Sequence, residues 1–86
     1  MSGRTAAILG ADTARATLAE LGEFDEIVVF ESSVDELERL IHELADPRLD
    51  YLLGSLPALP LPDAIVTRVV GDFPADDPEV ARITAP

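Results

Sequence analysis

A short apolar run at residues 27–30, Ile-Val-Val-Phe, most constrains what this chain can fold into. β-branched and aromatic residues favour the strand conformation, and a strand without a polar position has to be buried on both of its faces. Strands of this kind are typical of parallel sheets with helices packed against them. Acidic residues precede and follow the run, so the strand is expected to end there. The sequence therefore predicts an α/β protein.

Two helix patterns lie on either side of this strand. The first helix is expected over residues 12–21, with Asp12 as its cap and Gly22 as a left-handed C-terminal stop. The second helix begins at a capping box formed by Ser33 and Glu36, and apolar residues then repeat at helical spacing. Each helix separates two strand patterns, which is the arrangement of consecutive parallel strands.

Three further segments have strand composition, at residues 5–9, 49–53 and 64–70. The connection at residues 54–63 is rich in proline, lacks a helical pattern, and is shorter than the dozen or more residues that a parallel crossover needs. The fourth strand is therefore expected to be antiparallel. The predicted fold is a small βαβαββ sandwich with a mostly parallel sheet and an antiparallel fourth strand.

Two arrangements of the first three strands satisfy the right-handed crossover rule. The strand order is either 2-1-3 with one helix on each face, or sequential with both helices on one face. The layout of residues 5–54 resembles that of flavodoxin-like domains and of the small central-stalk subunit of rotary ATPases, without a specific shared motif. A single domain is expected over residues 1–71, followed by a solvated acidic tail at residues 72–86.

Two helices, one of them rich in alanine, cannot cover both faces of a sheet whose strands are apolar throughout. An apolar surface that stays uncovered on a small protein usually marks an interface. The sequence therefore predicts a protein partner or self-assembly into a homo-oligomer. The residues expected to carry this interface lie in the connector and the fourth strand: Leu56, Leu59, Leu61, Ile65 and Val69.

The charge of the chain further limits the classes of partner that it is expected to bind. It has 17 acidic residues against six cations, all of them arginine, and a formal net charge of -11. This balance argues against nucleic acid and anionic membranes as ligands, because Lys and Arg supply most of the affinity for phosphates. A salt-adapted host and a merely GC-rich genome both explain the missing lysine. With no cysteine, no leader pattern and no long apolar run, a cytoplasmic protein is expected.

A possible ligand site lies where the strands end, because open α/β sheets bind ligands beyond the carboxyl ends of their strands. The candidate residues there are small or polar, but the glycine-rich phosphate-binding patterns are missing. No catalytic residue, metal site or cofactor is predicted, because the one histidine, His42, lies on the polar face of a helix without a companion ligand. The candidate ligand-binding residues are Gly10, Asp12, Thr13, Ser32 and Ser33.

The sequence thus favours a non-catalytic interaction or regulatory module that assembles with itself or with a larger complex. The alternative interpretation is a domain that binds a small molecule, a nucleotide or phosphate, at the turn between Gly10 and Thr13.

Overall fold

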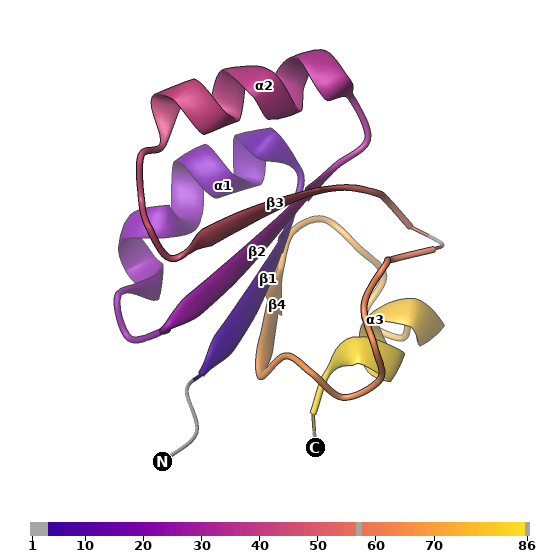
Figure 1. The fold of residues 1–86 in the computed structure, drawn as a ribbon. Helices are drawn as coiled ribbons and strands as arrows, with labels where there is room; N and C mark the ends of the chain where they lie inside the picture. Colours follow the sequence, from indigo (N-terminus) through magenta and orange to yellow (C-terminus); the bar gives the residue numbers. More distant parts are fainter. Residues whose placement is uncertain (1–3, 57, 86) are drawn as a thin grey trace.

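A computed structural model describes residues 4–56 and 58–85, which form a four-stranded sheet with helices on both faces (Figure 1). The strand order is β3-β2-β1-β4, and all three neighbouring pairs are parallel. The sequential order of the first three strands confirms the second of the two predicted arrangements. The elements are β1 (Thr5–Leu9), α1 (Ala11–Thr17), η1 (Leu18–Leu21), β2 (Glu26–Glu31), α2 (Val34–Glu43), β3 (Leu49–Leu53), β4 (Arg68–Val70) and α3 (Pro78–Ile83).

The two faces of the sheet have separate apolar cores because side chains alternate along each strand. Ile27 and Val29 of β2 pack into the first core, together with residues of α1, η1 and α2. Val28 and Phe30 of the same strand pack into the second core, with Ile83 of α3. All four residues are buried, as the unbroken apolar run predicts.

The predicted antiparallel fourth strand is wrong. β4 runs parallel to β1, with Ala7 aligned to Val69. The strand begins at Arg68 rather than at residue 64, so the connection occupies residues 54–67 and exceeds the minimum length of a parallel crossover. This crossover carries no helix among its described residues, and an irregular segment spans the second face instead.

The ends of the first helix also differ from the prediction. Gly10 is the N-cap residue, and Asp12 makes no capping bond but pairs with Arg15 at 2.9 Å. Gly22 has φ -62°, which is right-handed rather than left-handed. One of the two hydrogen bonds of the predicted capping box of α2 is confirmed, since the Ser33 hydroxyl accepts a hydrogen bond from the Glu36 amide.

The segment after residue 71 is not a solvated tail throughout. Asp77 caps α3 by accepting bonds from the backbone of Glu79 and Val80, and proline stands in the first turn of the helix. Ile83 at the end of this helix is completely buried in the second core. A few apolar residues scattered in an acidic segment are a weak signal in the sequence, yet the burial of Ile83 fixes the helix to the sheet. A domain boundary at residue 71 stays a prediction.

Candidate functional site

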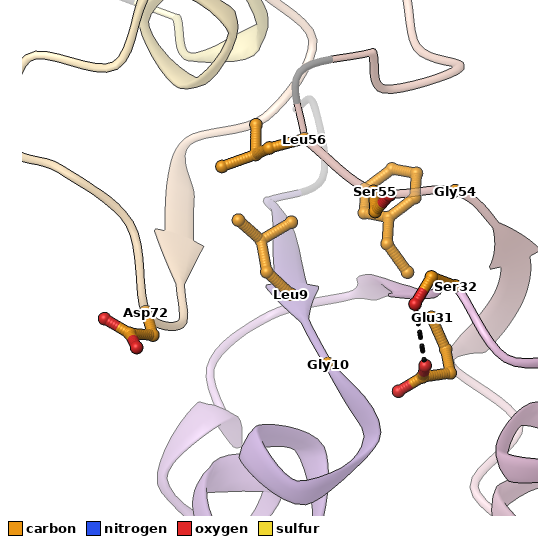
Figure 2. Close-up of a pocket in the computed structure, with 9 residues that line it drawn as sticks. Leu9, Gly10, Glu31, Ser32, Gly54, Ser55, Leu56 and Asp72 are labelled. Atoms are coloured by element: carbon orange, nitrogen blue, oxygen red, sulfur yellow. Dashed lines mark hydrogen bonds between the residues drawn. The ribbon is translucent and has the colours of Figure 1, made fainter.

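A cleft of about 340 Å³ lies at the carboxyl ends of the strands (Figure 2). Its lining comes from the ends of β1 and β2, from the turns that follow β1, β2 and β3, and from Asp72 just beyond β4. The residues are Leu9, Gly10, Phe30, Glu31, Ser32, Gly54, Ser55, Leu56 and Asp72. This is the position at which open α/β sheets bind ligands.

Glu31 organises the backbone of this cleft. Its carboxylate accepts one hydrogen bond from the amide of Ala11 and another from the amide of Ser33, both at 2.9 Å. These bonds, of which that from Ala11 contributes most, hold the pKa of Glu31 below its ordinary value of 4.5. The carboxylate therefore joins the end of β2 to the starts of both α1 and α2.

This arrangement disfavours an anionic ligand at the predicted turn. The Ala11 amide, which a phosphate would require at the start of α1, already binds the Glu31 carboxylate. Asp72 also borders the cleft, with its side chain directed away from Leu9 and Leu56 (Figure 2). The acidic Glu31 side chain repels a phosphate and favours a ligand that is neutral or cationic and offers hydrogen-bond donors.

The five predicted ligand residues do not form one site. Gly10 and Ser32 line the cleft, whereas Asp12 and Thr13 line a separate open hollow beside Val70 and Gly71. Ser33 caps α2. Glu31 was not among the predicted ligand-binding residues, although it follows the second strand, because its contacts with two other turns are not visible in the sequence.

A second hollow, which we call the second-face groove, opens on the sheet face opposite α1 and α2. Its volume is also about 340 Å³, and apolar side chains predominate in it. Ile65 is 45% exposed beside the groove, although it is a large apolar residue. The lining residues are Thr5, Glu26, Val28, Asp50, Tyr51, Leu52, Leu61, Ile65 and Val66.

The predicted interface residues are distributed over different environments. Leu61 and Ile65 line the second-face groove, and Leu56 lines the carboxyl-end cleft. Val69 packs, half-buried, against the second core. Leu59, which was expected at an exposed interface, is 4% exposed and belongs to that core itself.

Leu59 is buried because α3 holds the connector against the sheet. The backbone amide of Leu59 donates to the Glu79 carboxylate at 2.6 Å. Arg82 donates to the carbonyls of Leu59 and Leu61 at 3.0 and 2.7 Å, and its guanidinium also pairs with Glu79 at 2.6 Å. The bond from Arg82, followed by that from the Leu59 amide, lowers the pKa of Glu79 to about 2. The proline-rich pattern of the connector did not predict that α3 would hold it against the sheet.

Within the residues that the structure describes, no group of three or more acidic, histidine or cysteine side chains is placed to hold a metal ion. None of the described helices has the length and apolar character needed to cross a membrane.

The sequence matches no protein-family model and no curated protein, whereas its fold is similar to solved structures. One match is to a chain in the complex between the Haloferax volcanii Trm112 methyltransferase activator and the putative methyltransferase. Its TM-score is 0.76 at 24% identity, covering 99% of this chain and 42% of that chain. Another is the YcgJ protein from Bacillus subtilis, with TM-score 0.76, 19% identity, and coverage of 96% and 40%. The chain thus spans about two fifths of each matched chain, and the likeness establishes the fold.

Proposed function

We propose that this protein is a non-catalytic interaction module that binds a protein partner through the second-face groove. The observation that carries the proposal is an apolar hollow on the sheet, bordered by Leu52, Leu61 and Ile65. The β3-to-β4 connection places no helix over it among the described residues. Burial of these side chains by a partner is favourable by about 25 cal/mol for each Å² removed from water.

Two further observations support a protein partner. Glu26 and Asp50 contribute acidic side chains to the lining of the groove, which suits a partner surface that combines apolar and basic residues. One of the similar structures is itself a complex of a methyltransferase activator with a putative methyltransferase. The related fold therefore occurs in an assembly of two proteins.

The test uses two isoleucines of equal exposure. Ile65 beside the groove and Ile41 on α2 are each 45% exposed, so Ile65→Asp and Ile41→Asp carry the same chemical change at similar solvent access. Each tagged full-length variant is produced in the native host, and a partner identified with the wild-type chain is quantified by titration. We expect Ile65→Asp to weaken its affinity at least about 10-fold and Ile41→Asp to preserve it. Equal affinity of both variants, with both still folded by thermal unfolding, would contradict the proposal.

A second candidate function is supported by the carboxyl-end cleft. An acidic residue after the second strand of such sheets commonly accepts hydrogen bonds from ribose hydroxyls, and Glu31 occupies that position. The acidic lining then favours an uncharged nucleoside over a nucleotide. A thermal-shift series with adenosine, AMP and ATP tests this candidate. A rise in Tm with adenosine but not with ATP supports it, and no rise with any of the three contradicts it.

A further inference from the structure

The outer edge of β3, the end strand of the sheet beside β2, presents backbone hydrogen-bonding groups that no described strand pairs with. Ile27 of β2 donates its amide to the carbonyl of Arg48, just before β3. At the other end of the pair, the amide of Gly54 donates to the carbonyl of Glu31. Hydrogen-bonding direction alternates along a strand, so the even-numbered residues of β3 face β2 and the odd-numbered residues face outward. The outward residues are Leu49, Tyr51 and Leu53.

An exposed apolar row runs along one side of α2. Glu36 and Glu43 contact Arg15 of α1, so their side of the helix faces α1. Successive helical residues turn by about 100°, which places Val34 and Ile41 on the side away from these two glutamates. Their exposed fractions are 54% and 45%. The row therefore points away from α1.

This row lies beside the open edge of β3. α1 packs over β1 and β2, whereas α2 packs over β2 and β3 (Figure 1). The Tyr51 hydroxyl also ties the two elements together, because it donates to the carbonyl of Leu44 just after α2 at 2.6 Å. The side of α2 that faces away from α1 is therefore the side toward the outer edge of β3.

Three of the four large apolar residues that are exposed in the described part of the chain gather here. Leu53 is 54% exposed and shares a sheet face with Leu49 and Tyr51, which pack against the first core under α2. Natural edge strands are usually protected by charged side chains, proline or bulges, and the outward residues of β3 offer none of these. We call this surface the β3 border: the outward edge of β3 with Val34, Ile41 and Leu53.

We propose that a second copy of this chain pairs with β3 in antiparallel orientation, with Tyr51 beside the two-fold axis. Tyr51 of each copy then exchanges both backbone hydrogen bonds with Tyr51 of the other. The amide of Leu53 donates to the carbonyl of Leu49 in the other copy, and the two-fold axis repeats this bond. The Leu49 amide needs no partner there, because it already donates to the carbonyl of Asp46 at 3.1 Å.

The register follows from overlap and from charge. Pairing centred on Tyr51 brings all three outward residues of each copy into the ladder and places Asp50 opposite Leu52. A shift that placed Leu49 opposite Tyr51 would also place Asp50 opposite Asp50 of the other copy. Like charges directly opposite each other are destabilising, so this shift is disfavoured.

Two features select a second copy as the occupant. Val34 and Ile41 lie on either side of the middle of α2, and the two-fold axis reverses the direction of the helix. Val34 of one copy is therefore brought toward Ile41 of the other. In addition, the outward strand residues and the row on α2 are uncharged, although the chain carries a net charge of -11. An uncharged border is where two such copies approach with the least repulsion.

Net charge still opposes this association. Two copies of charge -11 repel each other at low ionic strength, and Glu38, exposed near the middle of α2, approaches its counterpart in the other copy. At 1 M salt the Debye length falls to about 3 Å, which screens this repulsion while backbone bonds and apolar contacts persist. Because the ladder is short, we expect a weak dimer that forms in concentrated solution and strengthens as salt rises.

Two matched isoleucine variants test the β3 border. Sedimentation equilibrium of the concentrated full chain in 1 M KCl gives the dimer dissociation constant of the wild type, Ile41→Asp and Ile65→Asp. Both isoleucines are 45% exposed and both variants add one negative charge, but only Ile41 lies at the border. We expect Ile41→Asp to raise the dissociation constant about 10-fold or more and Ile65→Asp to leave it near the wild-type value. Equal effects, or a wild type that stays monomeric at every concentration and salt, would overturn the proposal.

Single cysteines test the register, because the chain has no cysteine of its own. The Cα atoms of hydrogen-bonded residues directly opposite each other in an antiparallel ladder are about 5.5 Å apart, which suits a disulfide. Tyr51→Cys is therefore expected to form a covalent dimer under mild oxidation. Leu53→Cys stands opposite Leu49 rather than opposite itself and is expected to stay uncrosslinked. Crosslinking of Leu53→Cys but not of a folded Tyr51→Cys would contradict the register.

The dimer is independent of the second-face groove, which opens on the other face of the sheet. Ile41→Asp is therefore expected to lose dimerisation while it retains its affinity for the protein partner. Ile65→Asp is expected to show the reverse. The pair of measurements separates a failure of this inference from a failure of the proposed function.

Discussion

The carboxylate of Glu31, at the end of β2, accepts a hydrogen bond at 2.9 Å from the backbone amide of Ala11, the first residue of α1. The bond joins residues twenty positions apart and supplies an acceptor at the start of a helix that has no side-chain cap of its own. The cleft is therefore shaped around an internal carboxylate, which occupies a donor that an anionic ligand would need.

Replacement of Glu31 by Gln is expected to lower the free energy of unfolding by about 1 kcal/mol at pH 7. Ala11 and Ser33 donate to different oxygens of the carboxylate, so the Gln side chain, with one carbonyl oxygen, loses the charge and one of the two bonds. Urea unfolding measures the difference. Glu38→Gln, at an exposed position of α2, is the matched control and is expected to change stability little.

The same pair of variants predicts a pH dependence. The pKa of Glu31 is lower in the folded protein than its ordinary value of 4.5, so its contribution is complete above about pH 4.5 and is lost as pH falls through the folded pKa. The stability difference between wild type and Glu31→Gln is therefore expected to shrink between pH 6 and pH 3. A difference that grew over this range would contradict the assigned role of the carboxylate.

Gly71→Ala is expected to destabilise the protein by about 1–3 kcal/mol. Gly71 has φ +150°, and an added Cβ would lie 2.8 Å from the Cβ and 3.0 Å from the carbonyl oxygen of Leu9. Gly22 offers the opposite case, since its φ is -62° and an added Cβ meets nothing within 4 Å. Gly22→Ala is expected to be neutral or to stabilise by up to about 1 kcal/mol. Thermal unfolding of both variants checks the contrast.

Leu59→Ala is expected to cost about 2–5 kcal/mol, the usual range for a buried leucine. Leu59 is 4% exposed in the second core, whereas Leu53 at the end of β3 is 54% exposed. Leu53→Ala is therefore expected to change the free energy of unfolding by less than about 0.5 kcal/mol. Similar losses for both variants in urea unfolding would contradict the burial of the connector.

Arg82→Gln is expected to release the connector from α3, because it removes the donors to the carbonyls of Leu59 and Leu61. Hydrogen exchange should then become faster at the Leu59 amide and at its neighbours in the connector. Arg39→Gln is the control, since Arg39 is an exposed arginine that pairs with Glu36 three residues away in α2. Equal exchange in the connector of both variants would argue against docking by Arg82.

Local sequence patterns predicted much of the fold. The apolar runs at residues 5–9 and 49–53 match β1 and β3, and the Ser33 cap starts α2 where the capping box indicated. These features depend on neighbouring residues, because a few consecutive residues determine strand propensity, the pattern of burial and the presence of a helix cap. Of the five residues predicted to form an interface, Leu61 and Ile65 line the second-face groove, and their role in an interface stays a prediction.

The tertiary structure decided what depends on distant residues. The direction of β4 followed from where the strand begins, and the burial of Leu59 followed from α3, whose Glu79 lies twenty residues further along the chain. Glu31 likewise acquires its role from the backbones of two helices. The sequence alone determined which segments are apolar and which conformation they favour, because these are local properties. Only the tertiary structure decided which polar groups meet, because hydrogen bonds between remote segments depend on how the chain is routed.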